Sequence, residues 1–317
     1  MNILYFLVQQ TMFFSIPLLI VALGGMFSER SGVINIALEG IMIAGAFAGI
    51  LFISSYQTAM PGQPALLLAI LVAAATGVLV SLTHAYASIN MKANQVISGT
   101  AINMFAPAFA IYVARMIRTV QQIPFTNQFR IESVPVLGGI PFIGPLLFQN
   151  TYITTYLGFF ILLASWIALY KTRFGLRLRA CGEHPQAADS VGINVYKMRY
   201  AGVMLSGALA GIGGLVFVIP TSTQFNATVS GYGFLALAVL IFGQWKPGRI
   251  LGSAFFFGFM KAVASSYSGI SFLQNLPIPA NVYKMIPYLA TLIVLAFTSQ
   301  KSMAPRAEGI PYDKGSR

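Results

Sequence analysis

The sequence predicts an all-α, polytopic membrane protein, a single domain of eight to ten transmembrane helices over residues 1–317. Hydrophobic residues make up 57% of the chain and charged residues only 8%, with a mean hydropathy of +0.76. Soluble domains carry about 25% charged residues. Apolar stretches of about 18 or more residues, long enough to cross a bilayer core, recur from end to end. They are continuous rather than alternating, which favours helices over a β-barrel.

Nine apolar stretches are the predicted spans. The first begins the chain as MNILYFLVQQTMFFSIPLLIVALGG and lacks a basic region and a small-residue cleavage site, so we expect it to be retained rather than removed as a signal peptide. The short stretch at 233–244 and the tight turn at 27–32 are both compatible with a broken or re-entrant helix. The predicted spans are 4–26, 33–54, 64–87, 96–114, 153–170, 200–219, 233–244, 250–268 and 285–298.

The distribution of Lys and Arg predicts the orientation. If the loop 171–199 is cytoplasmic, fourteen basic residues fall inside and four outside, which agrees with the positive-inside rule. The tail 299–317 is then cytoplasmic and the N-terminus external. The net charge of +12 is a topological signal here and does not indicate nucleic-acid binding. The inside residues are Arg30, Lys92, Lys171, Arg173, Arg177, Arg179, Lys197, Arg199, Lys246, Arg249, Lys301, Arg306, Lys314 and Arg317, and the outside ones are Arg115, Arg118, Arg130 and Lys284.

Two polar interruptions suggest an internal repeat. NIALEG begins at Asn35 and NATVSG at Asn226, and each precedes an apolar helix rich in small residues. Each also leads to a Pro-Gly turn, at 61–62 and 247–248, and these turns fall on opposite sides of the predicted membrane. Inverted repeats are typical of transporters whose pathway lies between the halves. Chance matching of small residues is the alternative.

Five polar residues in or beside the spans are candidates for the translocation pathway. Glu39 interrupts the stretch 33–54, where a charge costs about 2.5–3.5 kcal/mol and must face the bundle or a wet cavity. Asn35 lies four residues before it, on the same helical face. The alternative for Glu39 is a carboxylate satisfied by backbone amides in a broken helix. Gln95 and Asn103 serve either the pathway or helix association, and Asn226 enters through the repeat.

No catalytic, cofactor or metal site is expected. The acidic residues are scattered, His84 and His184 lie in separate segments, and no GxxxxGK[ST] run exists that would bind ATP. The single cysteine, Cys181, excludes an intramolecular disulfide and is interpreted as a small filler. The run GALAGIGG at 207–214 predicts close helix packing rather than phosphate binding.

Two loops are long enough to have their own structure. In the loop 171–199, Pro185 fits the first turn of a short helix, QAADSVG, that Gly192 would end. Basic residues precede this helix, so we expect it to dock a soluble partner; the alternative is a solvated loop that only sets topology. The outer loop 115–152 is too rich in Pro and Gly for a long helix. It either covers a pathway mouth, contacts an external partner, or merely connects spans with a short surface helix.

Three segments resemble one known family. RFGLRLRACGEHPQAADSVGINV resembles the cytoplasmic coupling loop of ABC-importer permeases of the ribose, branched-chain amino acid and nucleoside type. ERSGVINIALEGIMIAGAFAG and YGFLALAVLIFGQWKPGRILGSAFFFG resemble other parts of the same permeases, in the same order. ERSGVINIALEG and NQVISGTAIN together resemble the nucleoside and simple-sugar subfamily of these permeases. Members of that subfamily resemble heterodimers, and NQVISGTAIN is similar to the second of the two permeases.

The resemblance implies function, partners and location. It implies a bacterial cytoplasmic-membrane permease that moves a small polar solute, most simply a nucleoside, by alternating access. Its partners would be a homologous permease, cytoplasmic ABC ATPases and an extracytoplasmic substrate-binding protein. Open alternatives are a sugar or branched-chain amino acid as solute, or a secondary transporter that works without ATP. A membrane-embedded enzyme lacks the converging groups it would need.

The resemblance also assigns residues. Asn35, Glu39 and Gly40 match the early signature. The sequence departs from the commoner pattern at Cys181 and His184, where small residues and Asn are more usual. The predicted ATPase-coupling residues are Gly175, Arg179, Gly182, Glu183, Pro185, Ala187, Ala188 and Gly192, which match the coupling-loop pattern, with the neighbouring bases Arg173 and Arg177.

Overall fold

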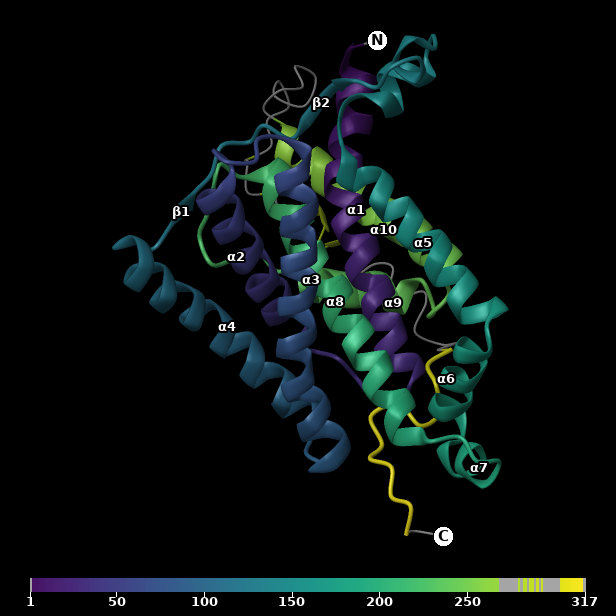
Figure 1. Cartoon of the computed structure of the whole chain (residues 1–317). Helices are drawn as coiled ribbons and strands as arrows, with labels where there is room; N and C mark the ends of the chain where they lie inside the picture. The colour runs from purple at the N-terminus through teal and green to yellow at the C-terminus, as the bar shows by residue number, and fades with distance from the viewer. Residues whose placement is uncertain are drawn as a thin grey trace.

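The computed structural model describes residues 2–267, 279, 282–283, 285–287, 289–290, 292 and 303–315. Within these ranges the chain is a helical bundle, as predicted (Figure 1). Six of the described helices are long and apolar enough to cross a membrane. They are α1 (Asn2–Arg30), α2 (Leu38–Tyr56), α3 (Gln63–Ala85), α4 (Gln95–Arg118), α5 (Ile153–Lys171) and α8 (Val195–Thr221).

Four further helices complete the described bundle. α9 (Tyr232–Phe242) is apolar but too short to cross alone, and α10 (Pro247–Ser266) follows it after a tight turn. α6 (Arg173–Glu183) and α7 (Pro185–Ser190) form a compact pair between α5 and α8. The predicted span 285–298 lies for the most part outside the described residues.

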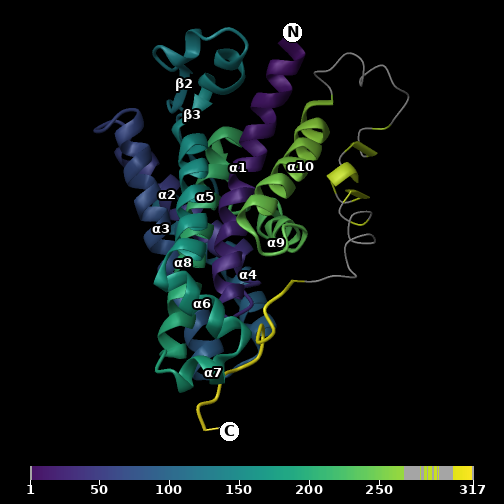
Figure 2. The same cartoon turned by 90° about the vertical axis from the view of Figure 1, so that its right-hand side faces the viewer.

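The two ends of the bundle differ in composition. One end, which we term the basic end, carries α6, α7 and the tail 303–315, at the bottom of Figures 1 and 2. The other, the loop end, carries the N-terminus and the long loop 119–152. Residues 61–62 lie at the loop end between α2 and α3, and Pro247 begins α10 next to Trp245, which contacts Glu29 and Arg30 at the end of α1. The bases at 284, 301 and 317 lie outside the described residues.

Helices α1 and α8 run antiparallel through the centre of the bundle, and the others pack around them (Figure 1). α8 packs against α2 and α3, while α1 packs against α9 and α10. Exchanging α1 with α8, α2 with α9 and α3 with α10 therefore leaves this set of contacts unchanged. The exchange also reverses the direction of the chain, which is the inverted repeat that the motifs at Asn35 and Asn226 suggested.

The second helix of the first repeat half begins later than predicted, whereas its counterpart α9 begins within one residue of the predicted start. The expected helix 33–54 begins only at Leu38, because residues 31–37, the unwound segment, are not helical. In the other half, residues 226–231 are also non-helical and lead into α9. α2 and α9 both begin near the middle of the bundle (Figures 1 and 2). They meet so closely that a methyl group on Gly233 would lie 2.3 Å from the backbone nitrogen of Glu39.

Glycines of α8 bring three helices into backbone contact. A methyl group on Gly214 would lie 2.0 Å from the carbonyl oxygen of Met42 in α2, and one on Gly211 would lie 2.2 Å from that of Ala73 in α3. Both distances are far below van der Waals contact. The close packing predicted from GALAGIGG is thus confirmed, and no larger residue fits at these positions.

Helix α4 is the exception to this tight packing. Only 17% of its most apolar stretch is buried, the lowest share among the six long helices, and its main contact is with α2. Met104, Phe105, Tyr112 and Met116 are all more than half exposed. In Figure 1 α4 leans away from the central helices. One apolar side of α4 is therefore left uncovered by the residues that the structure describes.

The long loop at the loop end contains two short antiparallel ribbons. β2 (Arg130–Ser133) pairs with β3 (Gln149–Tyr152). β1 (Ile123–Pro124) pairs with β4 (Gln224–Phe225), which directly precedes the non-helical residues 226–231. Ribbons were not predicted, because each needs a partner strand distant in sequence. The β1–β4 ribbon fastens the start of the loop to the segment that follows α8.

Candidate functional site

Glu39 joins the starts of α2 and α9 at the centre of the bundle. Its side chain is 8% exposed, and its carboxylate oxygens accept hydrogen bonds from the backbone N–H of Gly231 at 2.9 Å and of Gly233 at 2.6 Å. The first N–H groups of a helix have no partner inside it, and the helix dipole favours negative charge there. These contacts are those expected of a carboxylate satisfied by a broken helix. A role in the pathway stays a prediction.

Two side chains of α4 hold the unwound segment. Asn103 accepts the N–H of Gly40 at 2.7 Å through Oδ1 and donates to the carbonyl of Ile36 at 2.8 Å through Nδ2. Gln95 accepts the N–H of Ile34 at 2.7 Å. A buried backbone without helical bonds must find other partners. Gln95 and Asn103 supply them, which is the association role that the sequence left open beside the pathway.

Asn35 and His84 complete this support from the other side. Asn35, fully buried, donates from Nδ2 to Ser206 of α8 at 2.8 Å. His84 of α3 lies with Nε2 2.8 Å from the carbonyl of Ile34 and Nδ1 3.0 Å from Ser98. Because a carbonyl only accepts, Nε2 carries a proton. Sequence reasoning missed His84, whose only signal was a polar ring within an apolar stretch.

Asn226 lies apart from this junction. It lines a hollow of about 390 Å³ at the loop end, where the ribbon of β1 and β4 meets the end of α8. One wall is fixed by Asn127, which donates to the hydroxyl of Tyr152 at 2.8 Å and to the carbonyl of Ile219 at 2.9 Å. The structure thus brings four of the five pathway candidates together around the unwound segment and places the fifth in a separate hollow at the loop end. The hollow is lined by uncharged residues: Asn127, Pro220, Thr221, Ser222, Thr223, Gln224 and Asn226.

The predicted coupling loop contains two helices rather than one. Thr172 caps α6 by accepting the N–H of Gly175 at 3.1 Å. A methyl group on Gly175 would lie 2.2 Å from the carbonyl of Ala168, so only glycine permits this sharp turn out of α5. α7 begins at Pro185, and Gly192, with φ of +84°, follows its end. The short helix with these limits is the one predicted.

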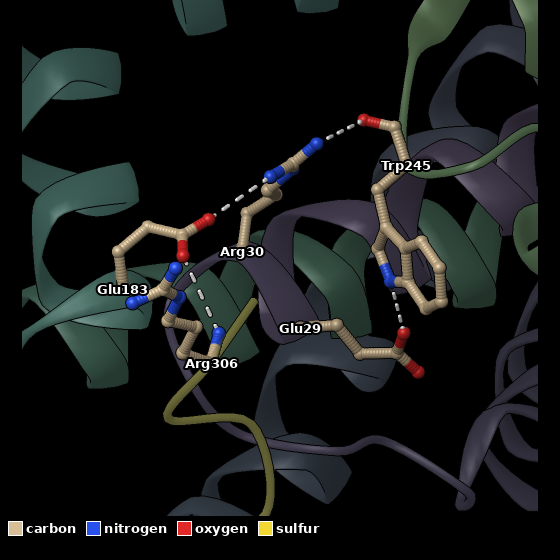
Figure 3. A network of polar contacts seen from close by, with 5 residues as sticks. All are labelled: Glu29, Arg30, Glu183, Trp245 and Arg306. Atoms are coloured by element: carbon tan, nitrogen blue, oxygen red, sulfur yellow. Dashed lines mark hydrogen bonds and ion pairs between the residues drawn. The ribbon is translucent and has the colours of Figure 1, made fainter. Parts of the chain in front are cut away.

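The α6–α7 unit is bound to the end of α1, and Arg30 of α1 in turn contacts the turn before α10 (Figure 3). A methyl group on Gly182 would lie 2.3 Å from the carbonyl of Arg30, and Glu183 pairs with the Arg30 guanidinium at 3.6 Å. Arg30 also donates to the carbonyl of Trp245 at 3.2 Å, and the indole N–H of Trp245 donates to Glu29 at 2.5 Å. The sequence analysis quoted Glu29, Arg30 and Trp245 within longer segments but predicted no contact among them.

The predicted coupling residues divide into exposed and internal ones. Ala188 and Pro185 are buried, and the guanidinium of Arg179 lies 5.1 Å from the ring centre of Tyr170. Burial raises the pKa of the Cys181 thiol to about 11, so it stays protonated at neutral pH and is a poor nucleophile. The exposed predicted residues are Arg173, Arg177, Ala187 and Gly192, and the exposed apolar side chains of Leu176 and Val191, which were not predicted, lie in the same segment. A hollow of about 300 Å³ lies among them, lined by Arg177, Val191, Gly192, Ile193, Asn194, Lys197 and Met198.

Comparisons with known proteins match the chain along its whole length. The model of the family described as branched-chain amino acid transport system / permease component matches residues 7–295. The guanosine ABC transporter permease protein NupQ of Bacillus subtilis is 44% identical, with 100% of this chain and 99% of that protein aligned. The nucleoside ABC transporter permease protein NupC of Lactococcus lactis is 40% identical over 99% of this chain and 98% of its own.

A second permease of the same organism matches less well. The nucleoside ABC transporter permease protein NupB of Lactococcus lactis is 22% identical, over 95% of this chain and 82% of its own. No solved structure matches the chain. The family match covers far more than half of the sequence and includes both halves of the repeat and the α6–α7 unit. The chain belongs to the family of permease components of branched-chain amino acid transport systems.

Proposed function

We propose that this chain is one permease subunit of an ABC importer that takes up nucleosides by alternating access, with ATP hydrolysed on a separate subunit. The observation that carries the proposal is the full-length similarity, 44% and 40%, to permeases named for guanosine and nucleosides. The uncharged polar hollow at the loop end supports an uncharged polar solute. The alternatives of a sugar, a branched-chain amino acid or an ATP-independent carrier become outcomes of the test.

The exposed face of the α6–α7 unit is the proposed ATPase-docking surface. Leu176 is 62% exposed and Val191 74% exposed, and the bases Arg173 and Arg177 lie beside them. Apolar side chains among bases suit a partner groove with an acidic rim. The internal contacts of Glu183 with Arg30 then transmit motion to α1. The same charges support a cytoplasmic location for the basic end and, with it, for the C-terminal tail.

The partner permease is proposed to pack on the uncovered apolar side of α4. One organism contains two relatives of this chain, of which one is much more similar than the other. This supports a heterodimer in which the chain takes the place of NupC. The Gln95 and Asn103 side chains reach the unwound segment from the same helix, so the pathway candidates lie next to that subunit boundary. The loop 119–152 at the loop end is the proposed contact of a substrate-binding protein.

Uptake by the reconstituted importer tests the proposal. Proteoliposomes containing the full complex, the external receptor and internal ATP are expected to accumulate labelled guanosine. Excess unlabelled nucleoside should block this uptake, whereas ribose or leucine should not. Uptake that persists without ATP and collapses with a proton ionophore would refute the ABC mechanism. Competition by ribose or leucine alone would refute the nucleoside assignment.

Substitution of the exposed face tests the docking surface separately. Leu176→Asp with Val191→Asp is expected to abolish co-purification of the ATPase while the chain stays in the membrane. Both side chains are exposed, so the change removes partner contacts rather than core packing. Val136→Asp is the matched control, because Val136 is 89% exposed at the loop end. Unchanged ATPase binding by the double variant would refute this surface.

A further inference from the structure

The tail 303–315 does not hang free from the basic end. Its backbone binds three separate elements: the N–H of Ala307 donates to the carbonyl of Gly182 in α6 at 2.8 Å, and that of Gly309 donates to Gly32 beyond α1 at 3.2 Å. The carbonyl of Ile310 accepts from Arg199, near the start of α8, at 3.0 Å. Figure 1 shows the tail, in yellow, passing α6 on its way to the C-terminus.

Side chains of the tail add contacts to α7, α8 and the turn before α4. Tyr312 is 4% exposed, and its ring meets that of Tyr196 edge to face at 5.5 Å. Asp313 pairs with Lys92 at 2.8 Å, and Lys314 approaches Asp189 of α7 at 3.9 Å. The exposed ion pairs contribute little stability. The buried ring and the backbone bonds are the firm part of the attachment.

Arg199 links the tail to the start of α8 through a partly buried hydrogen bond. The residue is 1% exposed, and its Nε and Nη2 atoms have no hydrogen-bond partner in the described part of the chain. The Ile310 carbonyl accepts from Nη1, and the ring of Tyr312 lies 6.0 Å from the guanidinium. The tail thus supplies a hydrogen-bond acceptor to a buried cation, and such charge-assisted hydrogen bonds are stronger than those between neutral groups. The position of α8 is therefore tied to the position of the tail.

We propose that residues 303–315 form a strap that fastens the α6–α7 unit to the end of α1 and the start of α8, so that force on this unit moves both central helices together. The inference rests on the proposed importer function. The strap contacts the elements of both repeat halves that meet at the basic end. Without the strap, the α6–α7 unit would keep its direct contacts with Arg30 through Gly182 and Glu183. It would lose the links that the tail makes from Gly182 to Gly32 and Arg199.

Strap variants of the full importer, assayed for both ATP hydrolysis and uptake, test this proposal. Ala307→Pro removes the N–H that binds Gly182, and Tyr312→Ala removes the buried ring. Each should leave the ATPase bound and hydrolysing while nucleoside uptake per ATP falls about fivefold or more, a typical size for a lost coupling. Tyr312→Phe and Ile310→Ala are matched controls expected to behave as wild type, since they keep the ring and the Ile310 carbonyl.

A chain ending at Ser302 provides the second test. Uptake per ATP equal to wild type in this truncation, or in point variants whose tail is shown to be detached by limited proteolysis, would overturn the proposal. If the truncated chain fails to accumulate, the two point variants decide. Absence of ATP-dependent nucleoside uptake in the wild-type complex would instead refute the importer function, so the two failures are distinguishable.

Discussion

Replacement of Glu39 by glutamine separates the structural role of this carboxylate from a role in the pathway. The carboxylate accepts two backbone N–H groups at the start of α9, from Gly231 and Gly233. Hydrogen bonds to a charged group contribute about 1.5–3 kcal/mol each. Glutamine keeps one oxygen acceptor but turns an NH₂ group toward the other donor. Glu39→Gln should therefore cost about 1.5–3 kcal/mol of unfolding free energy, and Glu39→Ala about 3–6 kcal/mol.

Denaturant unfolding of the purified chain in detergent measures this difference. Glu132→Gln is the matched control, because Glu132 is exposed in the ribbon at the loop end and should change stability by less than about 0.5 kcal/mol. Nucleoside uptake is measured on the same variants. If Glu39→Gln unfolds like wild type but changes uptake rate or selectivity, the carboxylate acts on the solute and the structural argument is wrong.

Three further predictions concern packing, the unwound segment and the strap. Gly214→Ala should prevent accumulation of folded chain, because the added methyl group has no space. Gly252→Ala is the control and should fold as wild type, since the space around Gly252 is open. Equal expression of the two variants would contradict the described packing. His84→Ala leaves a backbone carbonyl of the unwound segment without its donor and should cost about 1–3 kcal/mol of unfolding free energy, and an unchanged denaturation midpoint would refute this. Burial raises the pKa of the Glu308 carboxyl to about 7, although the hydrogen bond with Glu29 and the charge of Arg30 both lower it. Attachment of the strap should therefore weaken as the pH rises from about 4.5 to 7. Limited proteolysis of the tail should therefore speed up over this range in wild type but not in Glu308→Gln, and a pH-independent rate in wild type would contradict the assignment.

The direction of the pH effect follows from proton binding. A carboxyl group whose pKa is higher in the attached strap than in the detached one binds protons preferentially when attached. Attachment is therefore strongest below the detached pKa and weakest above the attached one. The groups facing Glu308 are Glu29 and Arg30 of α1, and Arg30 in turn faces Arg179 and Glu183 of α6.

The sequence was sufficient for features that depend on local composition. Hydropathy located the six long helices, and Pro185 with Gly192 located α7, because a proline at a helix start and a glycine after its end act locally. The inverted repeat was visible through its turns and polar interruptions. These signals do not require knowledge of any distant partner.

The unwound segment and the contacts at the basic end could not be predicted from the sequence. Residues 33–37 are as apolar as the helix they precede, so hydropathy extended the predicted span through them. Their helical bonds are replaced by side chains such as His84 and Asn103, 50 and 67 residues away. Trp245 and Glu29 are 216 residues apart. Hydropathy indicates whether a residue tends to be buried, but it does not identify the distant residue that will contact it.

The glycine contacts of α8 limit where this permease can change shape. Helices that meet through long side chains can slide when those side chains change rotamer. At Gly211 and Gly214 backbone lies directly on backbone, and there is no rotamer to change. We therefore expect α2, α3 and α8 to travel as one stiff body. Any opening and closing of a pore must then occur around that body, for example where α4, with its exposed side chains, lies against α2.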